Sequence, residues 1–347
     1  MKKAKPNREY WIDRAMAYEQ QAYDDTSIHI AKINQGYIIA QRYLSEEVRK
    51  IYARYFKEGM TEQEVKQILD TTVPAAELVF VKALASTIDD QEAQAAINRY
   101  LSQLAAKSRI TRLEELKAKA YVSAKYAGAT ELKENEKLYT KVAKDTWKQA
   151  TEEAAVYKSG QEFELKKGDQ VTTNQKQEVV IKDKNGKQVA KVKAENETAP
   201  AKVTEIPAEY TKRVAGRKWD GANYSQRIWK NTDKLAKRLG ELFNAHAMSG
   251  MTETAMARAL AEEFQTSMFN AKRLIRTEAA YVANAVKIER WKERGVKQYQ
   301  FSAVIDQRTS KICKSMNGKI FNVEDAQAGV NLPPMHPFCR SIAIIHL

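Results

Sequence analysis

The stretch from residue 7 to about residue 157 is almost free of glycine and proline. This feature limits most strongly what the chain can fold into. Alanine, glutamate, lysine, glutamine and leucine dominate the stretch, and all five are good helix formers. One apolar stripe at helical spacing consists of Val48, Ile51, Tyr52, Tyr55 and Phe56. We therefore predict that the amino-terminal region, residues 1–158, is mostly α-helical.

Local signals predict where these helices begin and end. Gly59 is expected to end the first long helix, because glycine readily adopts the left-handed cap conformation. Thr61 and Glu64 predict a capping box at the start of the next helix. Pro74 should end that helix, because proline disfavours the helical conformation in the preceding residue. Further helices are predicted over 75–108, 111–126 and 131–158.

The composition changes between residues 159 and 207, where short β-type runs appear at 163–165 and 179–181. Asn185 and Gly186 stand before a run containing Val189 and Val192. An Asn-Gly pair between apolar runs predicts a hairpin with a type I′ turn, in which both residues have positive φ. We predict a small β insertion over 159–207 that ends in a polar linker, residues 195–207.

The remaining part, residues 208–347, is predicted to contain helices over 208–295 and a strand-and-loop module over 296–347. Gly250 and Gly295 are expected to end helices, and Thr252 to open one. The predicted helices begin near 209, at 252 and at 267, and the last continues to 294. The predicted strands are 299–305, 318–321 and 341–345. The whole chain is therefore expected to have an α+β fold.

The charge balance favours polyanionic partners, because the formal net charge is +14 and the pI is near 9.4. No apolar run is long enough for a transmembrane helix, and the amino terminus does not have the pattern of a secretory signal. We therefore expect synthesis in the cytoplasm and no membrane partner. The chain has two cysteines, which excludes both a disulfide framework and a four-cysteine zinc site.

Cys313, His336 and Cys339 offer two thiolates and one imidazole, which are ligand types that Zn²⁺ accepts in tetrahedral geometry. Asp306, Asp325 or water would supply a fourth contact. In the alternative interpretation, the two cysteines are small buried residues and His336 is a hydrogen-bonding loop residue. The sequence contains no Walker-type loop, G-x-S-x-G elbow or H-E-x-x-H motif. We therefore assign no catalytic residue.

Arg276 and Glu278 lie two positions apart in a predicted helix, so their side chains point in different directions. This spacing argues against a pocket built from these two residues alone. Two interpretations remain open. The pair either anchors the strand-and-loop module that follows, or belongs to a salt-bridged helix face.

Several motifs between Tyr224 and Leu347 resemble the Mu F-like family of phage minor head, or head morphogenesis, proteins. They include Arg276 and Glu278, then Asp306, Arg308 and Thr309, then Cys313 and Gly318, and finally Pro333, Pro334, His336, Pro337, Cys339 and Arg340. Many members of this family carry cysteine at the positions of Ser310 and Ser341. This chain therefore keeps one thiol of each pair, which weakens the implied zinc site and leaves the fold signature intact.

The resemblance implies a structural minor capsid protein at the portal vertex of the virion, present in the host cytoplasm during assembly. The implied partners are the portal protein, with the scaffold or major capsid protein as further partners, and double-stranded DNA contacted without sequence specificity. We expect the helical region 1–158 to supply the portal contact. The alternative is a metal-dependent hydrolase or nuclease that acts on phage DNA through Asp306 and Asp325.

Overall fold

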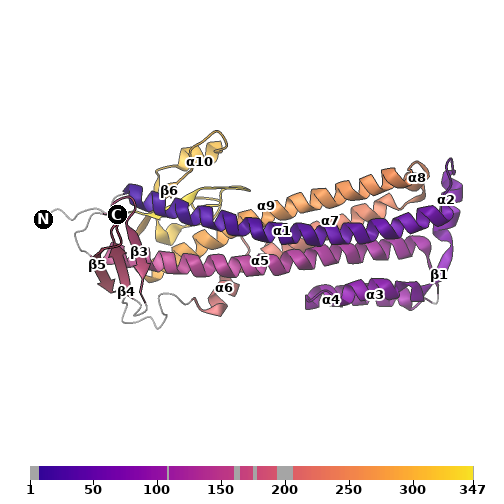
Figure 1. Ribbon diagram of the computed structural model, residues 1–347, viewed down its shortest axis with the longest axis horizontal. Helices are drawn as coiled ribbons and strands as arrows, with labels where there is room; N and C mark the ends of the chain where they lie inside the picture. Colours follow the sequence, from indigo (N-terminus) through magenta and orange to yellow (C-terminus); the bar gives the residue numbers. More distant parts are fainter. Residues whose placement is uncertain (1–7, 108, 160–164, 175–177, 194–205, 347) are drawn as a thin grey trace. The chain divides into compact units, whose positions relative to one another are not determined.

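The computed structural model describes residues 8–107, 109–159, 165–174, 178–193 and 206–346 (Figure 1). Helices dominate these residues, and short strands form small antiparallel sheets. The predicted α+β fold class is therefore confirmed. Across the described residues, every helix is too short or too polar to cross a membrane.

Three long helices provide most of the helical residues. They are α1 (Arg8–Tyr55), α5 (Arg112–Lys158) and α9 (Glu253–Glu293). The chain forms two compact units; three of the four boundaries between them fall inside these helices, and the fourth follows Tyr224, the first residue of α7. Unit 1 comprises Met1–Ser27, Glu136–Tyr224 and Arg273–Leu347, and unit 2 comprises Ile28–Asn135 and Ser225–Lys272. Each unit thus combines stretches that are distant in sequence, and the predicted domains 1–158, 159–207 and 208–347 remain a prediction.

Unit 2 contains the second part of α1, from Ile28, the first part of α5, to Asn135, the first part of α9, to Lys272, and several shorter elements. These are α2 (Glu62–Asp70), β1 (Thr72–Pro74), η1 (Ala75–Leu78), α3 (Val79–Ser86), α4 (Gln91–Ala105), β2 (Arg109–Thr111), α7 (Tyr224–Leu242, from Ser225) and α8 (Ala245–Ser249). One apolar core joins α3, α4 and α5 through side chains that include Val81, Ile97, Leu101 and Val122. The strands β1 and β2 pair antiparallel beside this core.

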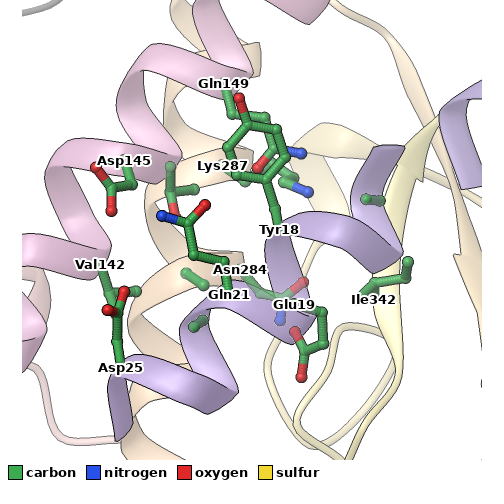
Figure 2. A pocket seen from close by; sticks show the side chains of 14 residues that line it. Tyr18, Glu19, Gln21, Asp25, Val142, Asp145, Gln149, Asn284, Lys287 and Ile342 are labelled. Carbon is green, nitrogen blue, oxygen red and sulfur yellow. The ribbon is translucent and has the colours of Figure 1, made fainter. Parts of the chain in front are cut away.

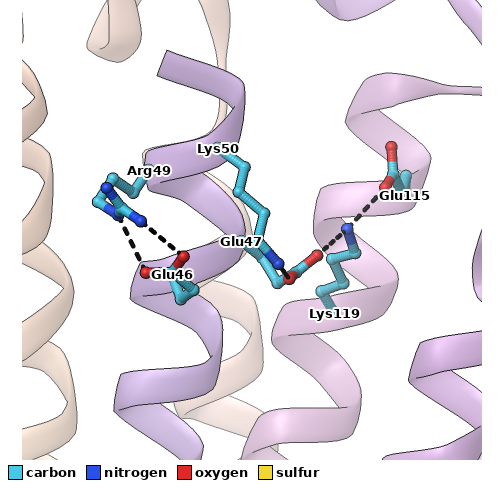
Figure 3. A network of polar contacts seen from close by, with 6 residues as sticks. All are labelled: Glu46, Glu47, Arg49, Lys50, Glu115 and Lys119. Atoms are coloured by element: carbon cyan, nitrogen blue, oxygen red, sulfur yellow. Dashed lines mark hydrogen bonds and ion pairs between the residues drawn. The ribbon is translucent and has the colours of Figure 1, made fainter. Parts of the chain in front are cut away.

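Charged side chains also link α1 to α5 within unit 2 (Figure 3). The buried Lys119 places its Nζ 2.5 Å from Glu47 Oε2 on α1 and 2.6 Å from Glu115 Oε1 on α5. Lys50 also contacts Glu47, while Arg49 pairs with Glu46 on the exposed side of α1. Because Lys119 is buried, its two carboxylate partners are required to offset the loss of hydration of the ammonium group.

The β insertion belongs to unit 1 and contains β3 (Gln170–Thr173), β4 (Glu178–Lys182) and β5 (Gln188–Lys193). These strands form an antiparallel sheet in the order β3-β4-β5. Val171, Val179 and Ile181 of the sheet pack against Trp11 of α1 and Val156 of α5. The insertion therefore shares a core with the helices, and its strands are more than an exposed hairpin.

The hairpin between β4 and β5 differs from the predicted type I′ turn. Gly186 has φ of +83°, whereas Asn185 does not have positive φ. The Gly186 amide donates to Asp183 O, and the Asp183 carboxylate accepts from the Asn185 and Lys187 amides. These bonds stabilise a three-residue loop, 184–186, whose last residue is the left-handed glycine, and this is the next most common hairpin type.

The strand-and-loop module is the carboxy-terminal part of unit 1. It contains β6 (Gln298–Ser302), α10 (Lys311–Met316), β7 (Ile320–Asn322), η2 (Val323–Asp325) and β8 (Ile342–Ile345). The strand order is β7-β6-β8, and both pairs are antiparallel. All three predicted strands are present within two residues of their predicted starts. Tyr299, Val323 and Ile345 pack with Trp291 of α9 and Ala154 of α5, so the module is fixed to the ends of two long helices.

Several predicted helix boundaries are confirmed. The capping box of Thr61 and Glu64 is present, α2 ends before Pro74, and Gly250 caps α8. The Thr252 hydroxyl accepts a bond from the Ala255 amide at the start of α9. Gly295 has φ of +73° directly after α9. These signals are local, so they do not depend on the tertiary structure.

Other boundaries were wrong. The first helix ends at Tyr55, before Gly59, which adopts φ of +77° in the turn before α2. The predicted helix 75–108 is divided, because Asp90 caps the start of α4 through the Ala93 amide. Conversely, α5 and α9 each run without the predicted interruption. The helix predicted to begin near residue 209 is interrupted. Its first part is α6 (Ala208–Ala215), and α7 begins only at Tyr224.

Two predictions for the insertion concern residues outside the described ones. They are Phe163 and Glu164 of the predicted strand 163–165, and residues 195–205 of the predicted linker.

Candidate functional site

The loop after β6 is organised by the carboxylate of Asp306. Its Oδ1 accepts bonds from the Arg308 amide at 2.8 Å, from the Thr309 hydroxyl at 3.2 Å and from Arg340 Nη2 at 2.6 Å. The bond from the Arg340 guanidinium holds the pKa of the Asp306 carboxyl well below its usual range. Asp306 is therefore ionised at neutral pH, and its role in the loop is accounted for by these three donors.

The helix α10 follows directly and positions Cys313. Ser310 is its N-cap, and the serine hydroxyl accepts a bond from the Cys313 amide at 3.1 Å. The Cys313 side chain is buried together with Phe301 of β6 and Cys339. Ser310 thus has a structural role of its own at the position where relatives carry a cysteine.

A tight turn at residues 336–339 brings His336 and Cys339 together. The Cys339 amide donates to His336 O at 3.1 Å, and Phe338 adopts φ of +59°. Pro337 at the second position and positive φ at the third are typical of a type II turn. The turn follows the buried Pro333 and Pro334, which are joined by a cis peptide bond. The Phe338 amide also donates to Thr277 Oγ1 of α9 at 3.3 Å.

These elements bring the three predicted ligands together. Cys313 Sγ lies 3.2 Å from His336 Nε2 and 3.7 Å from Cys339 Sγ, and all three ligand atoms lie within 4.8 Å of one another. Zn–S bonds of about 2.3 Å and Zn–N bonds of about 2.0 Å in tetrahedral geometry place ligand atoms roughly 3.5–3.8 Å apart. The cluster therefore has nearly the spacing that a zinc ion requires.

The orientation of His336 also suits a ligand. Its Nδ1 lies 2.8 Å from the carbonyl oxygen of Pro337, to which only a protonated nitrogen donates. Nε2, which faces Cys313, then carries the lone pair. Burial raises the pKa of the Cys339 thiol, so this sulfur stays protonated unless a cation is bound. A bound zinc ion would supply the positive charge that stabilises the thiolate, and it would link the 336–339 turn to α10.

A complete set of four protein ligands is not found among the described residues. The candidate metal-binding cluster consists of Cys313, His336 and Cys339. Asp306 is held by Arg340, and Asp325 Oδ2 accepts a bond from Asn322. A small cavity of about 20 Å³, lined by Ser310 and Ser341 among others, adjoins the cluster. This volume is enough for one water molecule, which suits the open position of a three-ligand site.

The remaining motif residues lie around this centre. Gly318 has φ of +85° and donates from its amide to Phe301 O at 2.8 Å, which closes the loop that holds α10. Glu278 is buried and accepts a bond from Trp219 Nε1 at 2.9 Å. Arg276 stacks its guanidinium 4.3 Å from the Tyr23 ring centroid. Between them, Thr277 accepts the bond from the Phe338 amide of the module, and the anchoring role of Arg276 and Glu278 stays a prediction.

A second feature of unit 1 was not predicted from the sequence. A cavity of about 40 Å³ lies between α1, α5, α9 and β8, with Glu19, Asn284 and Lys287 in its wall (Figure 2). Burial raises the pKa of Glu19 to about 7, against the opposing charges of Lys287 and Arg340. Glu19 lies in an ordinary helical stretch of α1, and no local motif marks it.

Residues 240–344 match the family described as Phage Mu protein F like protein. The match covers α8, α9 and nearly the whole strand-and-loop module, and it confirms the predicted resemblance over these residues. No curated protein and no solved structure matches the chain at a significant level.

Proposed function

Because residues 240–344 carry the phage Mu protein F like region, which implies a phage head morphogenesis protein, we propose a structural role at the portal vertex. In this role the protein associates with the portal during head assembly, beside the scaffold or major capsid protein, and is carried in the virion. The observation that supports the proposal is the family match, which coincides with the best-defined structural motif of the chain, the anchored strand-and-loop module.

The virion location has a direct test. Heads and mature particles of the phage that encodes the chain are purified and analysed by quantitative mass spectrometry. We expect a small, fixed number of copies per particle that co-purify with the portal. A phage that assembles normal heads after deletion of the gene, and whose particles never contain the protein, would contradict the proposal.

The portal contact is proposed to come from the helical region. In unit 2, α1 exposes Ile28, Ile38 and Ile39, with 58%, 38% and 40% of each residue accessible. Ile28 and Ile39 lie about three helical turns apart and so share one face of α1. Exposed apolar side chains on one helix face are typical of protein contacts. This face supports a portal contact and does not by itself identify the partner.

The full-length chain is the right reagent for this test. Binding to purified portal protein is measured for wild type and for the Ile28→Ser/Ile39→Ser variant, with Val189→Ser on β5 as the matched control. The α1 variant should bind at least about tenfold more weakly, the equivalent of about 1.4 kcal/mol. Equal binding of all three proteins would move the portal contact elsewhere.

Non-specific DNA contact is proposed as a secondary property. It is supported by the net charge of +14 and by Lys230, Lys234 and Lys237, which are exposed on one face of α7. Lysines that contact phosphates release counterions, so affinity falls steeply with salt. Reversing all three charges should reduce the slope of log affinity against log salt by about 3 in a DNA binding titration. An unchanged slope would remove α7 from the DNA interface.

A further inference from the structure

The connection between β6 and β7 exposes an unusual combination of side chains. Ile305 and Ile312 are 58% and 52% accessible, although the connection is only 17 residues long, from Ala303 to Lys319. In Figure 1, α10 and its flanking loops extend away from β6 and from the start of α1, and all these elements belong to unit 1. Large aliphatic side chains on such a projection are costly in water unless another molecule covers them.

Cations surround the two isoleucines. Arg308, Lys311, Lys314 and Lys319 are all exposed. The same segment contains one carboxylate, Asp306, which already accepts a bond from Arg340. Arg308 has a long contact of 3.8 Å with that carboxylate, whereas the three lysines form no ion pair with the described residues. We call the six side chains Ile305, Arg308, Lys311, Ile312, Lys314 and Lys319 the α10 surface.

The α10 surface is held in place from behind. Cys313 and Met316 on the inner side of α10 pack against Phe301 and Cys339. The Ala303 amide donates to Asn317 Oδ1 at 3.0 Å, and the Gly318 amide donates to Phe301 O. Because both ends of the connection are hydrogen-bonded to each other, a partner that binds here does not have to order the segment first, which favours binding.

We propose that the α10 surface is a docking site for an acidic protein surface that presents apolar side chains between its carboxylates. The proposal rests on the proposed function for its setting, in which this partner is another protein of the phage head. The charge of the surface calls for carboxylates or phosphates. The two isoleucines decide between these, because an apolar side chain gains from contact with a protein and gains little from a hydrated phosphate backbone.

Two variants separate the contribution of charge from the contribution of apolar contact. The Lys311→Glu/Lys314→Glu/Lys319→Glu variant reverses the charge, and Ile312→Ser removes apolar area and leaves the charge unchanged. A matched control, Lys182→Glu/Lys184→Glu/Lys187→Glu, changes the same charge on exposed residues at the β4–β5 hairpin. Full-length proteins are compared, and thermal unfolding verifies that each variant folds as wild type does.

The probes are purified portal protein, purified major capsid protein and a random-sequence DNA duplex. We expect both α10 variants to bind one of the two head proteins at least tenfold more weakly than wild type and the control do. Ile312→Ser should leave DNA affinity unchanged. Weaker DNA binding of the charge-reversal variant, with head-protein binding intact, would overturn the proposal in favour of a nucleic-acid surface.

The outcomes also distinguish this proposal from the proposed function. If wild type binds portal through the α1 face and both α10 variants bind as wild type does, the docking site is refuted and the head role stands. If wild type binds neither head protein and is missing from heads, both proposals fail together. A rescue provides the final check, because a compensating Glu→Lys change in the partner should restore binding of the charge-reversal variant.

Discussion

Single residues decide how closely the helices of unit 2 approach one another. A Cβ atom at Gly128 of α5 would lie 2.8 Å from both Thr232 Cγ2 and Trp229 Cζ3 of α7. Gly36 of α1 is similarly close to Thr130 of α5. Glycine inside a helix lowers its stability by about 1 kcal/mol relative to alanine. The fold tolerates that loss at these positions because only a hydrogen atom fits between the helices.

Gly128→Ala should therefore destabilise the protein, although alanine is the better helix former. Overpacking of this kind lowers the free energy of unfolding by about 1–3 kcal/mol. Gly240→Ala on α7 is the control, because its nearest neighbour would be Lys117 Cγ at an ordinary 3.7 Å. That change should raise stability by about 0.5–1 kcal/mol. Urea unfolding followed by circular dichroism measures both effects, and equal signs for the two variants would refute the packing argument.

A buried carboxyl makes a second prediction at the residue scale. Glu131 of α5 is fully buried; its Oε2 accepts a bond from the Tyr37 hydroxyl at 2.8 Å, and its Oε1 has no partner among the described residues. Burial raises the pKa of Glu131 to about 8. Burial also raises the pKa of Tyr37 well above its usual value, so this neighbour does not titrate in the same range.

The folded state keeps the Glu131 proton between pH values of about 4.5 and 8, whereas the unfolded chain releases it. The free energy of unfolding must therefore fall as pH rises through this window, by on the order of a few kcal/mol. Glu131→Gln keeps an acceptor for Tyr37 and should remove the contribution of Glu131 to this fall, while the contribution of Glu19, whose pKa is raised to about 7, should remain. Urea unfolding at several pH values tests it, with the exposed Glu92→Gln as control. A pH dependence in Glu131→Gln as large as that of wild type would assign the fall to other groups.

At the scale of elements, α10 and the 336–339 turn form the cysteine and histidine cluster. Ser310 caps α10, the Pro337–Phe338 turn reverses the chain, and Thr277 of α9 holds the turn in place. Each of these contacts involves no more than two elements. Together they bring residues more than twenty positions apart within ligand distance, so the cluster is preformed.

We predict that the protein binds one Zn²⁺ or Co²⁺ per chain at this cluster. Titration of the reduced protein with Co²⁺ should give thiolate charge-transfer absorption, which Cys339→Ser abolishes and Ser315→Ala on the exposed side of α10 leaves intact. Affinity should be lower than that of sites with four protein ligands, since water completes the coordination. If wild type gives no such absorption, the cysteines are simply buried apolar residues.

At the scale of the whole molecule, the two compact units do not follow the order of the sequence. Parts of α1 and α5 in unit 2 pack with α7 and α9, as shown by Gly128 against Thr232 and by the Tyr37 and Ser267 hydroxyls, 3.3 Å apart. The amino-terminal helices therefore complete their core only with segments from the second half of the chain.

A fragment of residues 1–158 should consequently fail to fold as a compact unit. It lacks α7 and α9, and the apolar residues that these helices cover would be exposed to water. We expect partial helicity by circular dichroism, no cooperative thermal transition and aggregation in size-exclusion chromatography. A monomeric fragment with a sharp transition would show instead that the helical region is an independent domain.

The sequence by itself determined the features whose causes are local. The capping box at Thr61, the glycines at 186, 250 and 295, and the strands of the carboxy-terminal module all depend on residues within a few positions of one another. The motif from Asp306 to Arg340 likewise predicted the members of the cluster and the resemblance that the family match over residues 240–344 confirms. Helix continuity was less predictable, because Gly128 is tolerated inside α5 through contacts with α7 that lie far away in sequence.

Only the tertiary structure decided which distant residues meet. The division into two units, the burial of Glu131 and the cavity beside Glu19 arise from the packing of residues far apart in sequence, as with Tyr37 and Glu131, which are 94 positions apart. The same packing leaves the α10 surface uncovered. Hydrophobic burial is non-directional, so a sequence shows which side chains seek a core, and the three-dimensional arrangement determines which of them share it.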